Sequence, residues 1–77
     1  MITSAQIRAA RALINWKQTD LSKAAGVSEM SVKNIERGTT DPRVSTLEAI
    51  RTALEAAGVS FLADGETTPG GPGVRLR

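Results

Sequence analysis

The segment from residue 18 to residue 37 constrains the fold most, because it holds two short helix patterns separated by a glycine turn. The first, about Gln18 to Ala25, is followed by Gly26, which can adopt the left-handed conformation that ends a helix. The second, about Glu29 to Arg37, follows Ser28, a preferred N-cap residue. Apolar residues stand where two crossed helices pack, at Leu21, Ala25, Val27, Val32 and Ile35. The segment therefore predicts two short helices that cross at a tight turn.

Helix-capping patterns predict two further helices. The first runs from about Ser4 to Asn15, because Thr3 and Gln6 have the spacing of a capping box. The other runs from about Thr46 to Ala57, with Ser45 as its expected N-cap. The four expected helices predict a mainly α fold.

The period of the apolar pattern changes from helical to alternating after residue 58. Val59–Ala63 and Val74–Arg77 both alternate, as the strands of a hairpin do. The stretch between them, Asp64–Gly73, is rich in Gly, Pro and Thr and predicts a mobile loop. We therefore expect a C-terminal β-hairpin beside the four helices.

Composition argues against several classes of chemistry. The chain has 77 residues, which corresponds to one domain, and it contains no Cys and no His. Thiol chemistry, disulfides, the usual zinc sites and the commonest general base are therefore absent. Asp41 and Glu36 are the one carboxylate pair worth considering for catalysis, and the sequence supplies neither a nucleophile nor a metal site beside them. We expect no enzyme activity, no catalytic residues, no cofactor and no metal.

Positive charge is concentrated in the first part of the chain. Residues 1–43 contain seven Lys and Arg against four Asp and Glu, whereas residues 44–77 contain three against four. A basic segment of this kind is typical of proteins that bind phosphate groups. No apolar run approaches the roughly 18–20 residues of a membrane span, and the first residues show no signal-peptide pattern.

Together these segments resemble the phage-repressor and Cro-like (XRE-type) family of helix-turn-helix transcriptional regulators. The likeness extends over about Ile7 to Val59. It rests on Trp16-Lys17-Gln18, Gly26-Val27-Ser28, Ile35-Glu36-Arg37-Gly38 and the Asp41-Pro42-Arg43 loop before a capped helix. The resemblance implies a lambda-repressor-like DNA-binding domain over residues 1–58. Residues 59–77 would form the hairpin, a candidate dimerisation element.

In this family the second helix of the motif lies in the major groove of double-stranded DNA. The resemblance therefore implies DNA contacts from Ser28, Glu29, Met30, Ser31, Lys33 and Asn34. It implies phosphate contacts from Gln18, Arg37, Thr39 and Arg43, with diffuse attraction from Lys17 and Lys23. Asn pairs well with adenine, Lys with guanine or a phosphate, Glu with the cytosine amino group, and Met with a thymine methyl group. Arg11 and Glu36 are expected to form a structural salt bridge.

We expect the chain to act as a homodimeric repressor or autoregulator in the cytoplasm of a bacterium or in a phage-like setting, at the nucleoid. The dimer interface is predicted on the hairpin, at Val59, Phe61, Leu62, Val74 and Leu76. One alternative is an antitoxin or anti-regulator that binds a protein partner. Another is a nonspecific nucleoid protein, and the exposed charges of the second motif helix would then be only a solvated face.

Overall fold

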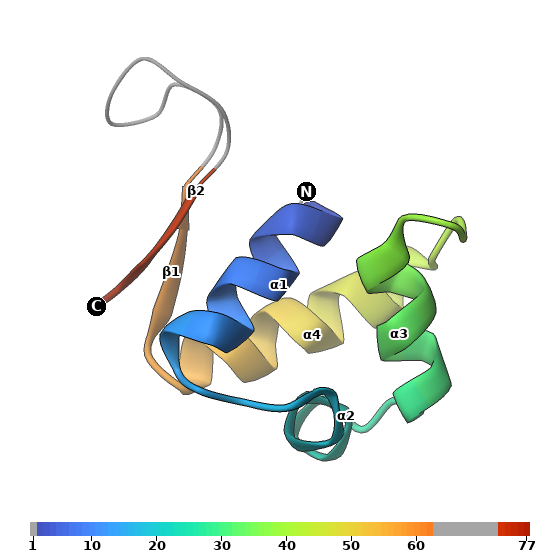
Figure 1. Cartoon of the computed structure of the whole chain (residues 1–77), viewed down its shortest axis with the longest axis horizontal. Coiled ribbons are helices and arrows are strands. Elements are labelled where there is room, and N and C mark those ends of the chain that lie inside the picture. The colour runs from blue at the N-terminus through green and yellow to red at the C-terminus, as the bar shows by residue number, and fades with distance from the viewer. Residues whose placement is uncertain (1, 63–72) are drawn as a thin grey trace.

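The computed structural model describes residues 2–62 and 73–77, which form four helices and a two-stranded antiparallel sheet. The elements in chain order are α1 Ser4–Leu13, α2 Gln18–Ala25, α3 Glu29–Arg37, α4 Val44–Ala56, β1 Val59–Leu62 and β2 Gly73–Leu76. Helices α1 and α4 occupy the centre of the view, with α3 at one end and the hairpin at the other (Figure 1). The mainly α fold with a C-terminal hairpin is confirmed.

The core draws one or more side chains from each helix and from β1. Its buried apolar members are Ile2, Ile7, Ala10, Leu21, Val32, Ile35, Ile50, Leu54 and Val59. The apolar positions of α1, α2, α3 and α4 recur at helical spacing, so one stripe of each helix faces this cluster. Trp16, in the connection between α1 and α2, packs half-buried against it, as expected for a core residue.

Local signals fixed the bounds of α2 and α3, and both helices begin and end as predicted. Gly26 ends α2 with φ of 70°, and Gly38 ends α3 with φ of 72°. The side chain of Lys17, at the start of α2, has no acceptor atom for a cap. Asp20 instead accepts the backbone N–H of Lys17 at 2.8 Å, and its charge also suits the positive end of the helix.

Helix α1 begins as predicted and ends two residues early. Thr3 and Gln6 form the expected capping box, with the Gln6 N–H donating to Thr3 Oγ1 at 3.1 Å and the Thr3 N–H to Gln6 Oε1 at 2.8 Å. The predicted end near Asn15 is wrong, because Asn15 has φ of 57° and turns the chain out of the helix. Asparagine tolerates this left-handed region better than most residues.

The start of α4 differs from the prediction. We expected Ser45 to cap a helix starting at Thr46, but the helix begins at Val44 and Arg43 is its N-cap residue. The backbone of Arg43 is extended, and its carbonyl accepts the N–H groups of Thr46 and Leu47, both at 3.1 Å. The helix also ends at Ala56, one residue before the predicted end.

The hairpin pairs Val59 with Leu76 and Leu62 with Gly73. The predicted strands are thus confirmed to within one residue at each described end. Ala63 and nearly all of the loop predicted at 64–73 fall on residues 63–72, outside the described part of the chain. None of the helices described is long and apolar enough to cross a membrane.

Gln6 ties this hairpin to α1. Its amide Nε2 donates to the carbonyl oxygens of Leu62, at 3.0 Å, and Gly73, at 2.9 Å. Gln6 is 5% exposed, and both its N–H groups and its oxygen, which accepts the Thr3 N–H, make hydrogen bonds. A second contact comes from α4, where the Arg51 guanidinium lies 5.8 Å from the ring centre of Phe61. The hairpin is therefore held against the helices by polar as well as apolar contacts.

Candidate nucleic-acid interface

The α2–α3 corner is fixed by hydrogen bonds across its turn. The Ser22 hydroxyl donates to the Val27 carbonyl at 2.6 Å, and the Val27 N–H returns to the Ser22 carbonyl at 3.2 Å. Leu21 and Val32 are fully buried where the two helices face the core. The corner therefore holds α3 at a set angle to α2, as a helix-turn-helix requires.

Helix α3 has a buried face and an exposed face. Val32, Ile35 and Glu36 are buried. Residues 30, 33, 34 and 37 are spaced by three, four and seven positions, so their side chains share the opposite face. This outward face consists of Met30, Lys33, Asn34 and Arg37. Met30 is 62% exposed. The face combines an apolar group, an amide and two positive charges, which suits a groove of base edges flanked by phosphates.

The first turn of α3 is organised by two serines. The Ser28 hydroxyl accepts the Ser31 N–H at 3.0 Å and donates to the Ser31 hydroxyl at 2.8 Å. Both predicted DNA-contacting serines are therefore engaged in capping the helix. Next to them, Glu29 and Lys33 form an ion pair at 3.7 Å across one turn, with 46% and 41% of their side chains exposed. Glu29 thus lies at the edge of the outward face.

The last turn of α3 is anchored by the predicted Arg11–Glu36 salt bridge, which the structure contains. Arg11 Nε lies 2.6 Å from Glu36 Oε2, and Arg11 Nη2 donates to Oε1 at 2.7 Å. Gln18 Nε2 donates to the same Oε1 at 3.0 Å. The Gln18 side chain, predicted to hold a phosphate, is half-buried and links the start of α2 to the end of α3.

This network keeps Glu36 ionised. Burial raises the pKa of the Glu36 carboxyl, but hydrogen bonds from Arg11 and Gln18 and the charges of Arg11 and Arg8 lower it, and the net pKa is below its usual value. The hydrogen bond to Glu36 raises the pKa of Arg11 above its ordinary value. Glu36 is 4% exposed, so its carboxylate has a structural role and does not contact a base.

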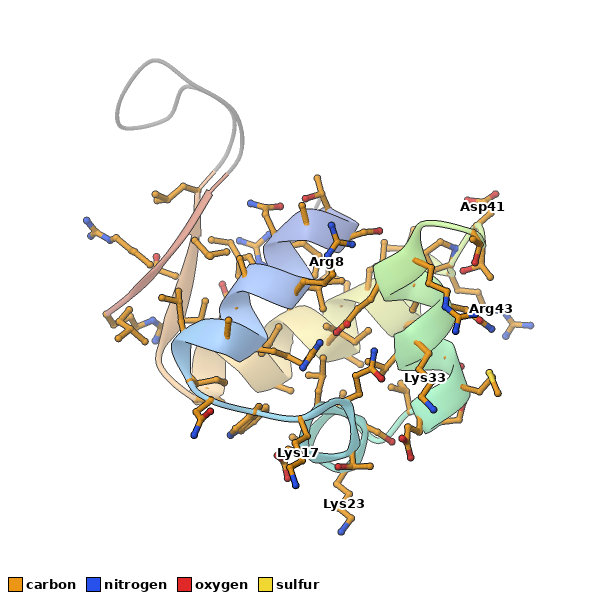
Figure 2. All side chains as sticks on the ribbon, viewed as in Figure 1. Arg8, Lys17, Lys23, Lys33, Asp41 and Arg43 are labelled. Atoms are coloured by element: carbon orange, nitrogen blue, oxygen red, sulfur yellow. The ribbon has the colours of Figure 1, made fainter. Side chains whose placement is uncertain are left out.

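Two residues of α1 that the sequence analysis did not identify also hold the end of α3. The Ser4 hydroxyl donates to the Ile35 carbonyl at 2.6 Å, and Arg8 Nη1 donates to the Glu36 carbonyl. Together with Arg11 they occupy every third or fourth position of α1 and therefore share one face. That polar stripe was visible in the sequence, but its partner helix was not. Figure 2 shows Arg8 extending from α1 on the side where α3 lies.

Further cations surround the outward face. Figure 2 shows Lys33 and Arg43 at the α3 end of the molecule, and Lys17 and Lys23 along α2. Arg37 and Thr39, at the end of α3 and in the following loop, are exposed. Thr39 donates its N–H and its hydroxyl to the Asn34 carbonyl, both at 3.4 Å. Lys33 and Arg43 therefore lie at the same end of the molecule, whereas Gln18, Ser28 and Ser31 make internal hydrogen bonds.

One predicted interface residue needs correction. Val59 was expected in a dimer interface, but it is fully buried by the chain's own helices, so it has no surface to offer a second copy. Phe61 and Val74 are half-buried against the core, Leu62 has intermediate exposure, and Leu76 is 53% exposed. Among the residues described, no cluster of three or more acidic, His or Cys residues forms a metal-binding group.

The fold and this corner define a helix-turn-helix protein. A family described as Helix-turn-helix matches residues 7–60, which is more than half of the chain. The chain belongs to that family, and within it to the phage-repressor, XRE-type regulators that the sequence pattern predicted.

Individual relatives agree with this assignment. HTH-type transcriptional regulators of Mycobacterium tuberculosis and Mycobacterium bovis are 40% identical to it over 50 residues, covering 65% of this chain. The match covers 20% of the length of these relatives. Among solved structures, the DNA-binding domain of the P22 C2 repressor, residues 1–76, has 33% identity and a TM-score of 0.64. That match covers 71% of this chain and 72% of the repressor domain.

Proposed function

We propose that this chain is a transcriptional regulator that binds double-stranded DNA sequence-specifically, with α3 in the major groove. The observation that carries the proposal is the outward face of α3, with Met30, Lys33, Asn34 and Arg37 presented on a rigid helix-turn-helix corner. The similarity to the DNA-binding domain of a phage repressor supports it. An α-helix fits the major groove of B-DNA, and side chains on its exposed face reach base edges there.

The phosphate backbone would be held on both sides of α3. Three residues at the end of α3 and the start of α4 would contact the phosphates of one DNA strand: Arg37, Thr39 and Arg43. Lys17 and Lys23 on or next to α2 add attraction to the other side (Figure 2). These contacts supply affinity and fix the position of α3, whereas the base contacts supply specificity. Gln18 contributes through its backbone at the helix start, because its amide is bonded to Glu36.

Binding as a homodimer follows from the small size of the outward face. One recognition helix reads only a few base pairs, and a dyad doubles the readout over half-sites about one helical turn apart. A two-stranded hairpin is marginally stable alone, and this one leaves Leu76, the partner of Val59, 53% exposed. Packing of the hairpins across a two-fold axis would cover Leu76. The dimer would act in the cytoplasm by occupying a promoter, as a repressor or autoregulator.

A selection from a random duplex library, at roughly 0.15 M salt, tests the proposal directly. We expect an enriched inverted repeat for the wild-type chain and loss of enrichment for Asn34→Ala. Arg75→Ala, an exposed substitution on β2, serves as the control and should retain the enriched site. Binding without a preferred sequence, lost as salt rises, would contradict the proposal in favour of a nonspecific nucleoid protein. Regulation in cells that survives Asn34→Ala would favour action through a protein partner.

A further inference from the structure

The Glu29–Lys33 pair places an acceptor and a donor side by side at the edge of the outward face. Glu29 Oε1 and Lys33 Nζ are 3.7 Å apart, and both side chains remain roughly half exposed. Glu29 lies in the first turn of α3, the part of a recognition helix that enters the groove most deeply. The Glu29 carboxylate can therefore accept, and the Lys33 ammonium group can donate, a hydrogen bond to a partner outside the chain.

A carboxylate on a DNA-binding surface needs a specific reason, because it is repelled by phosphates. Here the neighbouring ammonium group neutralises it, so the pair as a whole approaches DNA without net charge. An ionised carboxylate only accepts hydrogen bonds and an ammonium only donates them. The pair therefore requires a surface that offers a donor next to an acceptor.

We propose that Glu29 and Lys33 act as one unit that reads a single C·G base pair, an inference that rests on the proposed function. In the major groove this pair presents the cytosine amino donor beside the guanine O6 and N7 acceptors. The amino group and O6 are hydrogen-bonded to each other and so lie about 3 Å apart. The two side-chain atoms are 3.7 Å apart, slightly farther than these two base atoms, so each can face one of them. Glu29 accepts from cytosine while Lys33 donates to guanine.

The same geometry disfavours an A·T pair at this position. An A·T pair also sets the adenine amino donor next to acceptors, N7 of adenine and O4 of thymine, but these two acceptors stand apart and O4 lies beside a methyl group. Guanine instead offers two adjacent acceptors to an ammonium group. The neighbouring Met30 and Asn34 provide the apolar and amide groups that suit thymine and adenine, so an A·T pair is better read beside the C·G pair. The ion pair thus specifies the C·G position, which Met30 and Asn34 do not read.

Library selection with five versions of the full chain tests this inference. They are the wild type, E29Q, K33M, the double variant E29K/K33E, and E55Q. Glu55 forms an ion pair of the same i, i+4 spacing with Arg51 on α4, at 3.2 Å, and serves as the matched control. In the wild-type site one C·G position should be preferred by roughly tenfold, as expected for a specific base contact. Both single variants should lose that preference and keep the other positions. The charge-swapped variant should prefer G·C there, and E55Q should match the wild type.

Several results would overturn the inference. Retention of the C·G preference in both single variants would do so, as would an A·T pair at the position that the variants change. Loss of affinity for all sequences alike in K33M, with a smaller salt dependence, would make Lys33 a phosphate contact instead. Failure of the wild-type chain to enrich any site would reject the proposed function itself and this inference with it. Because both side chains are exposed, thermal unfolding should verify that each variant is folded.

Discussion

Removing the positive partner of Glu36 should destabilise the fold strongly. Arg11→Met keeps most of the apolar stem of the side chain but leaves a carboxylate that is 4% exposed with Gln18 as its remaining side-chain donor. Breaking a buried ion pair from one side costs about 3–5 kcal/mol. We expect the lower end, about 3 kcal/mol, because the Arg11 side chain is 19% exposed. In a domain of this size that lowers Tm by roughly 12–24 °C.

The effect should depend on pH in a defined direction. The pKa of Glu36 in the folded chain is below the ordinary value of 4.5, so the stabilisation is complete above that value. It is lost as pH falls through the lower folded pKa, where the carboxyl becomes protonated. The gap in unfolding free energy between wild type and Arg11→Met should therefore be large near about pH 7 and narrow towards about pH 3.

Urea unfolding followed by circular dichroism measures both quantities. Glu55→Gln is the control, because it breaks an ion pair whose side chains are 40% and 32% exposed. It should change the unfolding free energy by about 0.3–0.5 kcal/mol. An Arg11→Met penalty that is equal at both pH values would refute the electrostatic reasoning and assign the effect to packing of the arginine stem.

Three further predictions concern the scaffold and the DNA contacts. Gln6→Leu removes the two hydrogen bonds from Gln6 to the carbonyl groups of Leu62 and Gly73, so the free energy of urea unfolding should fall by about 1–3 kcal/mol. Gly26→Ala places a Cβ in open space but at φ of 70°, so a conformational cost of about 1 kcal/mol should lower the thermal midpoint. Arg37→Ala should weaken binding of all duplexes alike and lower the salt dependence by about one counterion, measured by fluorescence anisotropy.

Features set by neighbouring residues were predictable from the sequence. The bounds of α2 and α3 depend on Ser28 as a cap and on glycines that adopt a left-handed conformation, and both are local signals. The start of α4 was not predictable in this way. Ser45 is a better cap residue than Arg43, yet the helix extends past it and leaves Val44 60% exposed. The cap preference therefore predicted a start two residues later than the helix has.

Contacts between distant segments could not be read from the sequence pattern. Gln6 was identified as half of a capping box, but its bonds to the hairpin join residues 56 and 67 positions apart. Arg8 and Ser4 show helical spacing without showing that they face the end of α3. Val59 has the alternation of an interface strand, yet the helices bury it completely. In the site, the outward face of α3 was predictable because the family pattern and the helical period both specify it.

The position of α3 in the groove is the central claim, and amide NMR shifts on titration with a selected duplex test it most directly. The account predicts the largest shifts at Met30, Lys33, Asn34 and Arg37, with smaller shifts near Arg43 and Lys17 and little change where α1 packs on the hairpin. Shifts concentrated on β1 and β2, with α3 unchanged, would contradict the account and place the nucleic-acid contact elsewhere on the chain.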